Sequence, residues 1–354
     1  MMSRHDMRVR KVALLGASGL VAQRFQQRLC NHPWFELVAV YGSPRTAGRK
    51  LADLPWHLPE TRPNLPSVIV ESMDSILTDV KDFEIVFSAL PSEIARELEK
   101  PLAAQGCYVF SNASTHRMDD DVPLVIADLN PHHLLSLRNR TETGFVACST
   151  NCTIVPAALP LKPLWDFIGL DDVKISTEQS LSGGGIELLK TFQKTGEYPI
   201  DIPGEAEKMQ EECLSLLGRA QSEGVRLANL PVDISVKRVS REYGHIVKVT
   251  ATLHFEKEKE EVIEWMQNYR SRAQALKLPS APQYPFVFVE QLIPESLPNP
   301  AIDLKAGMVV RVSNVVVSGT SITFNAWSEN TIRGAAGGTV LLAELAIAEG
   351  LLGE

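Results

Sequence analysis

The chain lacks several features that would each have indicated a class of protein. Its 43 acidic residues outnumber the 35 basic ones, which gives a net charge of −8. This acidic composition argues against a nucleic-acid partner, because binding one needs a basic surface to neutralise phosphates. Its five cysteines have neither metal-ligand spacing nor a disulfide-like pattern, which indicates free thiols in a reducing cytoplasm and no metal site. The most apolar stretch, 340–352, is interrupted by Glu344 and Glu349, so no membrane span is predicted.

Length and composition indicate two globular domains. A chain of 354 residues exceeds the size at which one hydrophobic core usually stops growing. Over residues 1–150, short apolar runs alternate with helix-like segments, which is typical of a Rossmann-like, doubly wound α/β domain. Strands are predicted at Val12–Leu15, Leu37–Tyr41, Ile85–Leu90, Tyr108–Phe110 and Phe145–Ala147, and helices at Leu20–Cys30 and Ser92–Ala104.

The pattern changes after residue 150. Longer alternating strands and helices over residues 151–330 predict an α+β catalytic domain with a mainly antiparallel sheet, whose free face would form a homodimer or homotetramer. The segment 331–354 is expected to be a helix that completes the first domain. The strands are predicted at Val173–Leu181, Val232–Val239, Ile246–Phe255, Met308–Val317 and Ile322–Trp327, and the helices at 152–167, Glu187–Lys194, Glu205–Leu217 and Glu260–Leu276.

A glycine-containing turn follows the first predicted strand. Gly16-Ala17-Ser18-Gly19-Leu20-Val21 leads directly into a helix. Glycines allow a tight turn whose N–H groups approach a pyrophosphate at the helix N-terminus. The spacing is shorter than the full dinucleotide fingerprint, so an ordinary strand-to-helix turn stays an alternative.

The loop after the second strand indicates which dinucleotide would bind. It contains Ser43, Arg45 and Thr46 and no acidic residue for a ribose 2′-hydroxyl. Hydroxyl groups and a guanidinium suit a 2′-phosphate. The loop therefore predicts NADP rather than NAD, with a solvated loop arginine as the alternative.

The segment Cys148-Ser149-Thr150-Asn151-Cys152-Thr153 carries the candidate nucleophile. Cys152 lies where an apolar run ends and a helix-like run begins. The positive end of a helix dipole favours a thiolate, so we expect its pKa to fall below the free value of roughly 8.5. Thiolates are the nucleophiles of covalent aldehyde-oxidising and acyl-transferring enzymes. A buried, inert cysteine is the alternative.

The second half contains further candidate groups. Gln179 ends a strand before a glycine-rich turn and can serve as an orienting amide. Glu205 and Lys208 lie three apart on one helix face, where a surface ion pair is the alternative. Arg238 can clamp a carboxylate, and His245 can act as an acid or base, although a structural histidine is the alternative.

One anion-binding candidate lies in the first half. Ser111-Asn112-Ala113-Ser114-Thr115-His116-Arg117 follows a predicted strand, at the edge where open α/β sheets bind ligands. Arg117 could hold an anion there.

Taken in order, these motifs resemble the aspartate-semialdehyde dehydrogenase family, most closely its archaeal and fungal branch. The resemblance covers almost the whole chain. It rests on Gly16–Val21, Ser88-Ala89-Leu90-Pro91, Ser111–Ser114, Arg117-Met118, Asp121–Ile126, Asn151-Cys152-Thr153, Gln179 with Ser182-Gly183, Glu205 with Lys208, Arg238 with Gly244-His245, and Asn330–Gly337.

The resemblance implies a role for each matching residue. Cys152 would be the nucleophile, His245 the acid/base and Gln179 the orienting amide. Arg238 would bind the substrate carboxylate and Glu205 its amino group, while phosphate would meet Arg117, Lys208 and Asn112. NADP would contact Gly16, Ser18, Gly19, Leu20, Val21, Ser43, Arg45, Thr46, Ser88, Leu90, Ser182, Gly183 and Asn330.

The implied reaction is the reversible, NADPH-dependent conversion of 4-aspartyl phosphate to L-aspartate 4-semialdehyde in lysine, methionine and threonine synthesis. A malonyl-CoA reductase on the same scaffold is the nearest alternative, and an N-acetyl-glutamyl-phosphate reductase a more distant one. A non-catalytic NADP-binding regulator is the alternative of another class.

Three residues depart from the family pattern. Ala22 replaces a third glycine, Thr150 replaces a proline before Asn-Cys, and Glu178 adds a carboxylate beside Gln179. Because neighbouring side chains of a strand point to opposite faces, we expect Glu178 to point away from the site.

Overall fold

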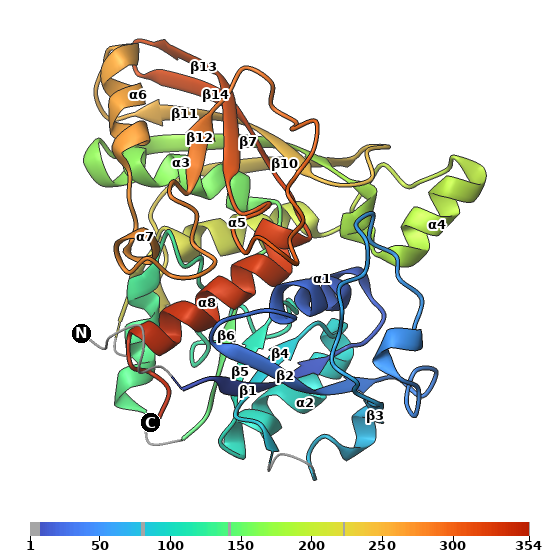
Figure 1. The fold of residues 1–354 in the computed structure, drawn as a ribbon. Helices are drawn as coiled ribbons and strands as arrows, with labels where there is room; N and C mark the ends of the chain where they lie inside the picture. Colours follow the sequence, from blue (N-terminus) through green and yellow to red (C-terminus); the bar gives the residue numbers. More distant parts are fainter. Residues whose placement is uncertain (1–7, 79–81, 141–142, 222–223, 354) are drawn as a thin grey trace.

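The computed structural model describes residues 8–78, 82–140, 143–221 and 224–353. Two six-stranded sheets form the centres of two lobes (Figure 1). The first sheet has the order β3-β2-β1-β4-β5-β6, and every pairing in it is parallel. Its strands are β1 (Arg10–Leu15), β2 (Phe35–Gly42), β3 (Val70–Ser72), β4 (Ile85–Ser88), β5 (Tyr108–Ser111) and β6 (Phe145–Cys148).

Helices cover both faces of this sheet, which explains its continuous apolar strands. Side chains of α1 (Leu20–Leu29) and α8 (Gly337–Ala348) share one hydrophobic cluster with alternate residues of β1, β4 and β5. Residues of α2 (Ser92–Ala104) pack in the cluster on the opposite face. The predicted doubly wound fold is confirmed, and α8 lies near α1 in Figure 1, where the two helices share this cluster.

The second sheet has the order β10-β7-β11-β14-β13-β12. Its three central pairings are antiparallel as expected, whereas the outer pairs β10–β7 and β12–β13 are parallel, so the sheet is mixed. Its strands are β7 (Leu170–Gln179), β10 (Val232–Arg238), β11 (His245–Leu253), β12 (Phe286–Phe288), β13 (Val310–Ser318) and β14 (Ser321–Ser328).

Three helices pack on one face of the second sheet. α3 (Ile154–Phe167), α5 (Glu205–Leu216) and α6 (Lys259–Asn268) share a cluster with the inward residues of β7 and β11. The expectation of a single helix over Glu260–Leu276 is wrong, because Ser271 caps a separate short helix, α7 (Arg272–Ala275). α4 (Ile186–Thr195) projects from the side of the molecule in Figure 1, and β8 (Arg219–Ala220) pairs with β9 (Val225–Arg226).

Among the described helices, none is both long enough and apolar enough to cross a membrane.

Candidate active site

The carboxyl ends of four parallel strands are aligned at one edge of the first sheet. The register joins Leu15 to Ser88, Ser88 to Ser111, and Ser111 to Cys148. The loops that follow these residues therefore leave the sheet side by side, at the edge where open α/β sheets bind ligands. The predicted phosphate loop, Asn112 and the Cys152 segment all come from these loops.

The first of these loops forms a backbone cradle. Gly16 has φ of +100°, and a Cβ there would lie 3.1 Å from the Ala89 carbonyl oxygen. Gly19 is the N-cap of α1 and has no side-chain cap, so the first N–H groups of the helix keep no side-chain acceptor. This arrangement fits a pyrophosphate. Ala22 is buried below the loop, 3.6 Å from that Cβ position.

The loop after β2 presents polar groups to solvent. Ser43 and Arg45 are exposed, whereas Thr46 is buried and its hydroxyl donates to the Ser43 carbonyl over 3.1 Å. Arg45 forms no ion pair with the residues that the structure describes, so its guanidinium is available to a 2′-phosphate.

Cys152 and His245 are far apart in the sequence but lie in contact. Cys152 lies two residues before α3, and His245 is the first residue of β11. Cys152 Sγ lies 3.2 Å from His245 Nε2. A Cβ on Gly183 would lie 3.1 Å from the imidazole Cε1, and one on Gly334 would collide with Cys152, so two glycines allow the close approach.

Burial keeps both members of this pair uncharged. Desolvation, followed by the charge of Glu205, raises the pKa of Cys152 to about 12, although Arg117 opposes the shift. Desolvation, followed by Arg241 and Arg238, lowers the pKa of His245 to about 3. The expectation of a lowered thiol pKa is therefore wrong for this structure, because burial outweighs the dipole of the nearby helix.

Four polar side chains surround the pair. Glu205 Oε1 accepts hydrogen bonds from Asn151 Nδ2 over 2.8 Å and from Gln179 Nε2 over 3.4 Å. Arg238 donates from Nη1 to the Ser180 carbonyl over 3.0 Å, and its buried Nε has no protein partner. The structure thus brings the predicted carboxylate, amide and guanidinium together around Cys152.

A buried glutamate that was not predicted supports the nucleophile loop. Glu212, on α5, is 3% exposed and pairs with Arg117 Nη1 over 2.9 Å. Its other oxygen accepts from the Thr150 hydroxyl and from the Asn151 main-chain N–H, each over 2.7 Å. Thr150 therefore gains a hydrogen bond that a proline could not make. Glu212 could have been found from the sequence by its spacing, because it lies seven residues after Glu205, two turns along the same helix face.

We expect Glu212→Gln to lower both stability and turnover. Breaking a buried ion pair by removing one charge costs about 3–5 kcal/mol, and the variant leaves the largely buried side chain of Arg117 without its counter-charge. Urea unfolding measures the loss of free energy, and steady-state assays measure turnover. The control is Glu211→Gln, at an exposed neighbouring position; equal behaviour of the two variants would contradict this role.

Two buried donors remain at the predicted anion site. Arg117 also donates to the Asn112 carbonyl over 2.9 Å, but Arg117 Nε and Asn112 Nδ2 have no protein partner. Both fit an anionic ligand such as phosphate. Lys208 is exposed on α5 and forms no ion pair with Glu205 or with any other described residue.

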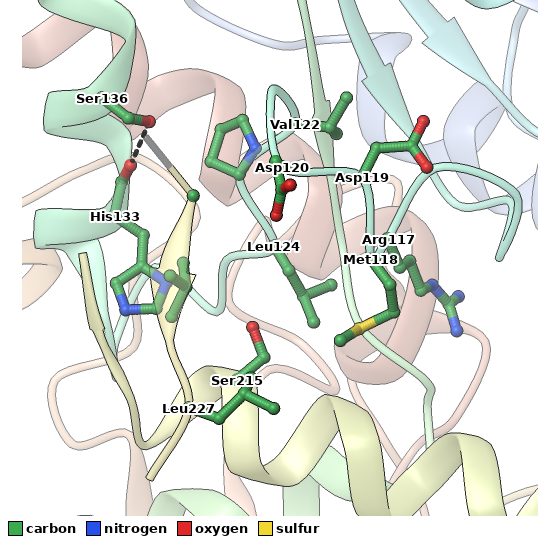
Figure 2. A pocket seen from close by; sticks show the side chains of 13 residues that line it. Arg117, Met118, Asp119, Asp120, Val122, Leu124, His133, Ser136, Ser215 and Leu227 are labelled. Carbon is green, nitrogen blue, oxygen red and sulfur yellow. Dashed lines mark hydrogen bonds between the residues drawn. The ribbon is translucent and has the colours of Figure 1, made fainter. Parts of the chain in front are cut away.

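A cavity of about 260 Å³ lies behind Arg117. Figure 2 shows Met118 and Leu124 pointing into it while the guanidinium of Arg117 turns away. Cys152 and His245 do not line the cavity, whereas Arg117, from the predicted anion site, does.

The predicted cofactor residues of the second lobe lie beside His245. Asn330 Oδ1 accepts from the hydroxyls of Ser180 and Ser182 and from the N–H of Gly244. Glu178 points away from Gln179, as expected. Its carboxylate lies 3.1 Å from the Nζ of Lys237. No group of three potential metal ligands is found within the described ranges.

Known proteins resemble this chain in sequence and structure. Residues 11–137 match the family model described as semialdehyde dehydrogenase, NAD binding domain. The chain is 36% identical to the aspartate-semialdehyde dehydrogenase of Archaeoglobus fulgidus, over 96% of this chain and 99% of that protein. It is 31% identical to the malonyl CoA reductase (NADP) of Metallosphaera sedula, over 98% and 99% of the two chains. The crystal structure of the Candida albicans aspartate semialdehyde dehydrogenase with NADP is similar with a TM-score of 0.81 and 28% identity, over 98% of this chain and all of that one.

Proposed function

Because the chain belongs to the aspartate-semialdehyde dehydrogenase family, we propose that it converts L-4-aspartyl phosphate to L-aspartate 4-semialdehyde with NADPH, reversibly, in lysine, methionine and threonine synthesis. The observation that carries the proposal is the contact of Cys152 Sγ with His245 Nε2 at 3.2 Å, beside Glu205 and Arg238.

The proposed chemistry begins with attack by Cys152. After the thiol proton leaves to solvent, the sulfur adds to the acyl-phosphate carbonyl, and the carbon–oxygen bond to phosphate breaks, leaving a thioester on Cys152 and free phosphate. Bound NADPH supplies the hydride for the reduction. His245 Nε2 then assists as the carbon–sulfur bond of the thiohemiacetal breaks and the aldehyde leaves.

An oxyanion that develops on the reacting carbon needs N–H donors, and one main-chain donor beside Cys152 already has an acceptor. The Asn151 N–H binds Glu212, and the Thr153 N–H donates to the Asn151 side chain over 2.8 Å. Among the described residues, the main-chain N–H of Cys152 meets no acceptor outside its own residue, where it lies near the sulfur. Cys152 N–H is therefore our proposed oxyanion donor from this turn.

The charged groups suit the three ends of the substrate. We assign Arg238 to the carboxylate and Glu205 to the ammonium group. We assign Arg117, Asn112 and Lys208 to phosphate, since buried donors of Arg117 and Asn112 have no protein acceptor. Gln179 orients the substrate from beside Glu205.

The cofactor is NADP, held against the first lobe. The Gly16 cradle and the uncapped start of α1 fit its pyrophosphate. We assign Ser18, Gly19, Leu20 and Val21 to the same group, with Ser88 and Leu90 at the sheet edge. Ser182, Gly183 and Asn330 face it from the second lobe. We infer an NADP-binding domain of residues 1–150, completed by 331–354, and a catalytic and dimerisation domain of 151–330.

Arg45 is expected to determine the preference for NADPH. Loss of its charge-assisted hydrogen bonds to a 2′-phosphate in Arg45→Ala should lower kcat/KM for NADPH by about 10–100-fold and leave that for NADH unchanged. Arg49→Ala, at an exposed neighbouring arginine, is the control. Equal efficiency of NADH and NADPH in the unmodified protein would contradict the assignment.

The resemblance to a malonyl CoA reductase makes a CoA thioester the second candidate substrate. Glu205 favours the aminated substrate, because malonyl-CoA has no ammonium group for it to bind. The test measures NADPH oxidation with aspartyl phosphate and with malonyl-CoA, and phosphate dependence in the reverse direction. Efficient malonyl-CoA reduction, or semialdehyde oxidation that ignores phosphate and arsenate, would favour the second candidate.

A non-catalytic regulator would have no need of the Cys152–His245 contact.

We further propose that the protein is a cytoplasmic homodimer or homotetramer. Size-exclusion chromatography with light scattering tests the assembly.

A further inference from the structure

His245 has a hydrogen-bond partner on each ring nitrogen. Nδ1 accepts from the main-chain N–H of Ser180 over 3.0 Å, while Nε2 lies 3.2 Å from Cys152 Sγ. A main-chain N–H can only donate, so Nδ1 must present its lone pair. In the neutral imidazole the single proton then resides on Nε2, which faces the sulfur.

A second buried layer holds Ser180 in place. Its hydroxyl lies 3.1 Å from His245 Nδ1 and 3.1 Å from Asn330 Oδ1. Asn330 Oδ1 also accepts from the N–H of Gly244, the residue before His245, over 2.8 Å. Ser180 and His245 are fully buried and Asn330 is 3% exposed. The Asn330 amide therefore holds both Ser180 and Gly244 beside the ring without competition from water.

The surroundings of the ring oppose a second proton. The titratable and charged groups that face it are Cys152 before α3, Arg238 at the end of β10, and Arg241 in the turn between β10 and β11. Two of the three are cations, and no described carboxylate makes a hydrogen bond to the ring. Burial and these cations lower the pKa of His245.

We propose that Ser180 is a positioning residue that holds His245 as its neutral Nε2–H tautomer, so that the ring acts on the sulfur and on the reacting carbonyl oxygen as a hydrogen-bond donor. The identity of that carbonyl rests on the proposed function. A neutral imidazole can stabilise an oxyanion in this way without becoming a cation. The proton of the Cys152 thiol then leaves to solvent, because Nε2 already carries a proton.

The tautomer can be observed in the resting protein. ¹⁵N NMR of histidine-labelled protein, without substrate or cofactor, reports the protonation of each ring nitrogen, and His245→Asn assigns the signals. Between about pH 6 and 8 we expect a protonated Nε2 and an unprotonated Nδ1 at His245. A protonated Nδ1 would overturn the proposal. Because no substrate is present, this failure is distinct from a wrong acyl donor.

Variants of Ser180 test its role in turnover. Ser180→Ala removes the hydroxyl, so we expect kcat to fall about 10-fold, KM for the acyl phosphate to stay within about twofold, and alkylation of Cys152 at fixed pH to slow. Ser180→Thr keeps the hydroxyl and should restore both rates. Ser328→Ala is the control, since this buried hydroxyl lies opposite His245 in the β11–β14 register but outside the network. Equal effects of Ser180→Ala and Ser328→Ala would also overturn the proposal.

Discussion

Replacing Cys152 by alanine is expected to abolish turnover, by at least about 10³-fold, while NADPH still binds. The variant removes the only atom that forms the thioester, and no other thiol can substitute. Cys148, the nearest in sequence, is fully buried at the end of β6, and burial raises its pKa.

Steady-state assays and NADPH fluorescence titration measure the two properties separately. Cys30→Ala is the matched control, because Cys30 lies at the C-terminal end of α1, away from the site. Substantial activity in Cys152→Ala would refute the covalent mechanism.

His245→Asn is expected to lower kcat by about 10²–10⁴-fold, because the His245 ring contacts the Cys152 sulfur over 3.2 Å and can donate a proton there. KM should change little, since Arg238 and Glu205 are assigned to bind the substrate. A large rise in KM with unchanged kcat would contradict this division of roles.

The same substitution changes how stability depends on pH. In the unfolded chain a histidine binds a proton below its ordinary pKa of about 6.5, whereas buried His245 stays neutral down to about pH 3. The free energy of unfolding therefore falls as the pH drops through this range. Urea unfolding should show a weaker acid dependence in His245→Asn; an unchanged dependence would contradict the lowered pKa.

Local patterns predicted the regular elements well. α2 has the predicted bounds, and the apolar runs of the first sheet all became parallel strands. β3 and β12 were missed because each has only three residues and lies at a sheet edge, where few side chains are buried. The break before α7 was missed because the residues on both sides of the Ser271 cap have a helical pattern, which concealed the interruption.

The site was harder to predict where partners are distant in sequence. The contact of Cys152 with His245 joins residues 93 positions apart. Only the resemblance to a family, carried by the order of the motifs, indicated that the two residues share one site. The charge state of the Cys152 thiol was not predictable, because it depends on desolvation in the folded protein rather than on the helix that follows. Glu212 and Ser180 were missed for the same reason, since their importance comes from the loops they contact.

The most direct test of a covalent mechanism is a single-turnover measurement without NADPH. Mixing the protein with aspartyl phosphate should release a burst of about one inorganic phosphate per active site, and mass spectrometry should find an aspartyl group on the Cys152 peptide. The burst should be absent in Cys152→Ala. Phosphate release that requires NADPH, or a burst that survives in Cys152→Ala, would contradict the thioester mechanism.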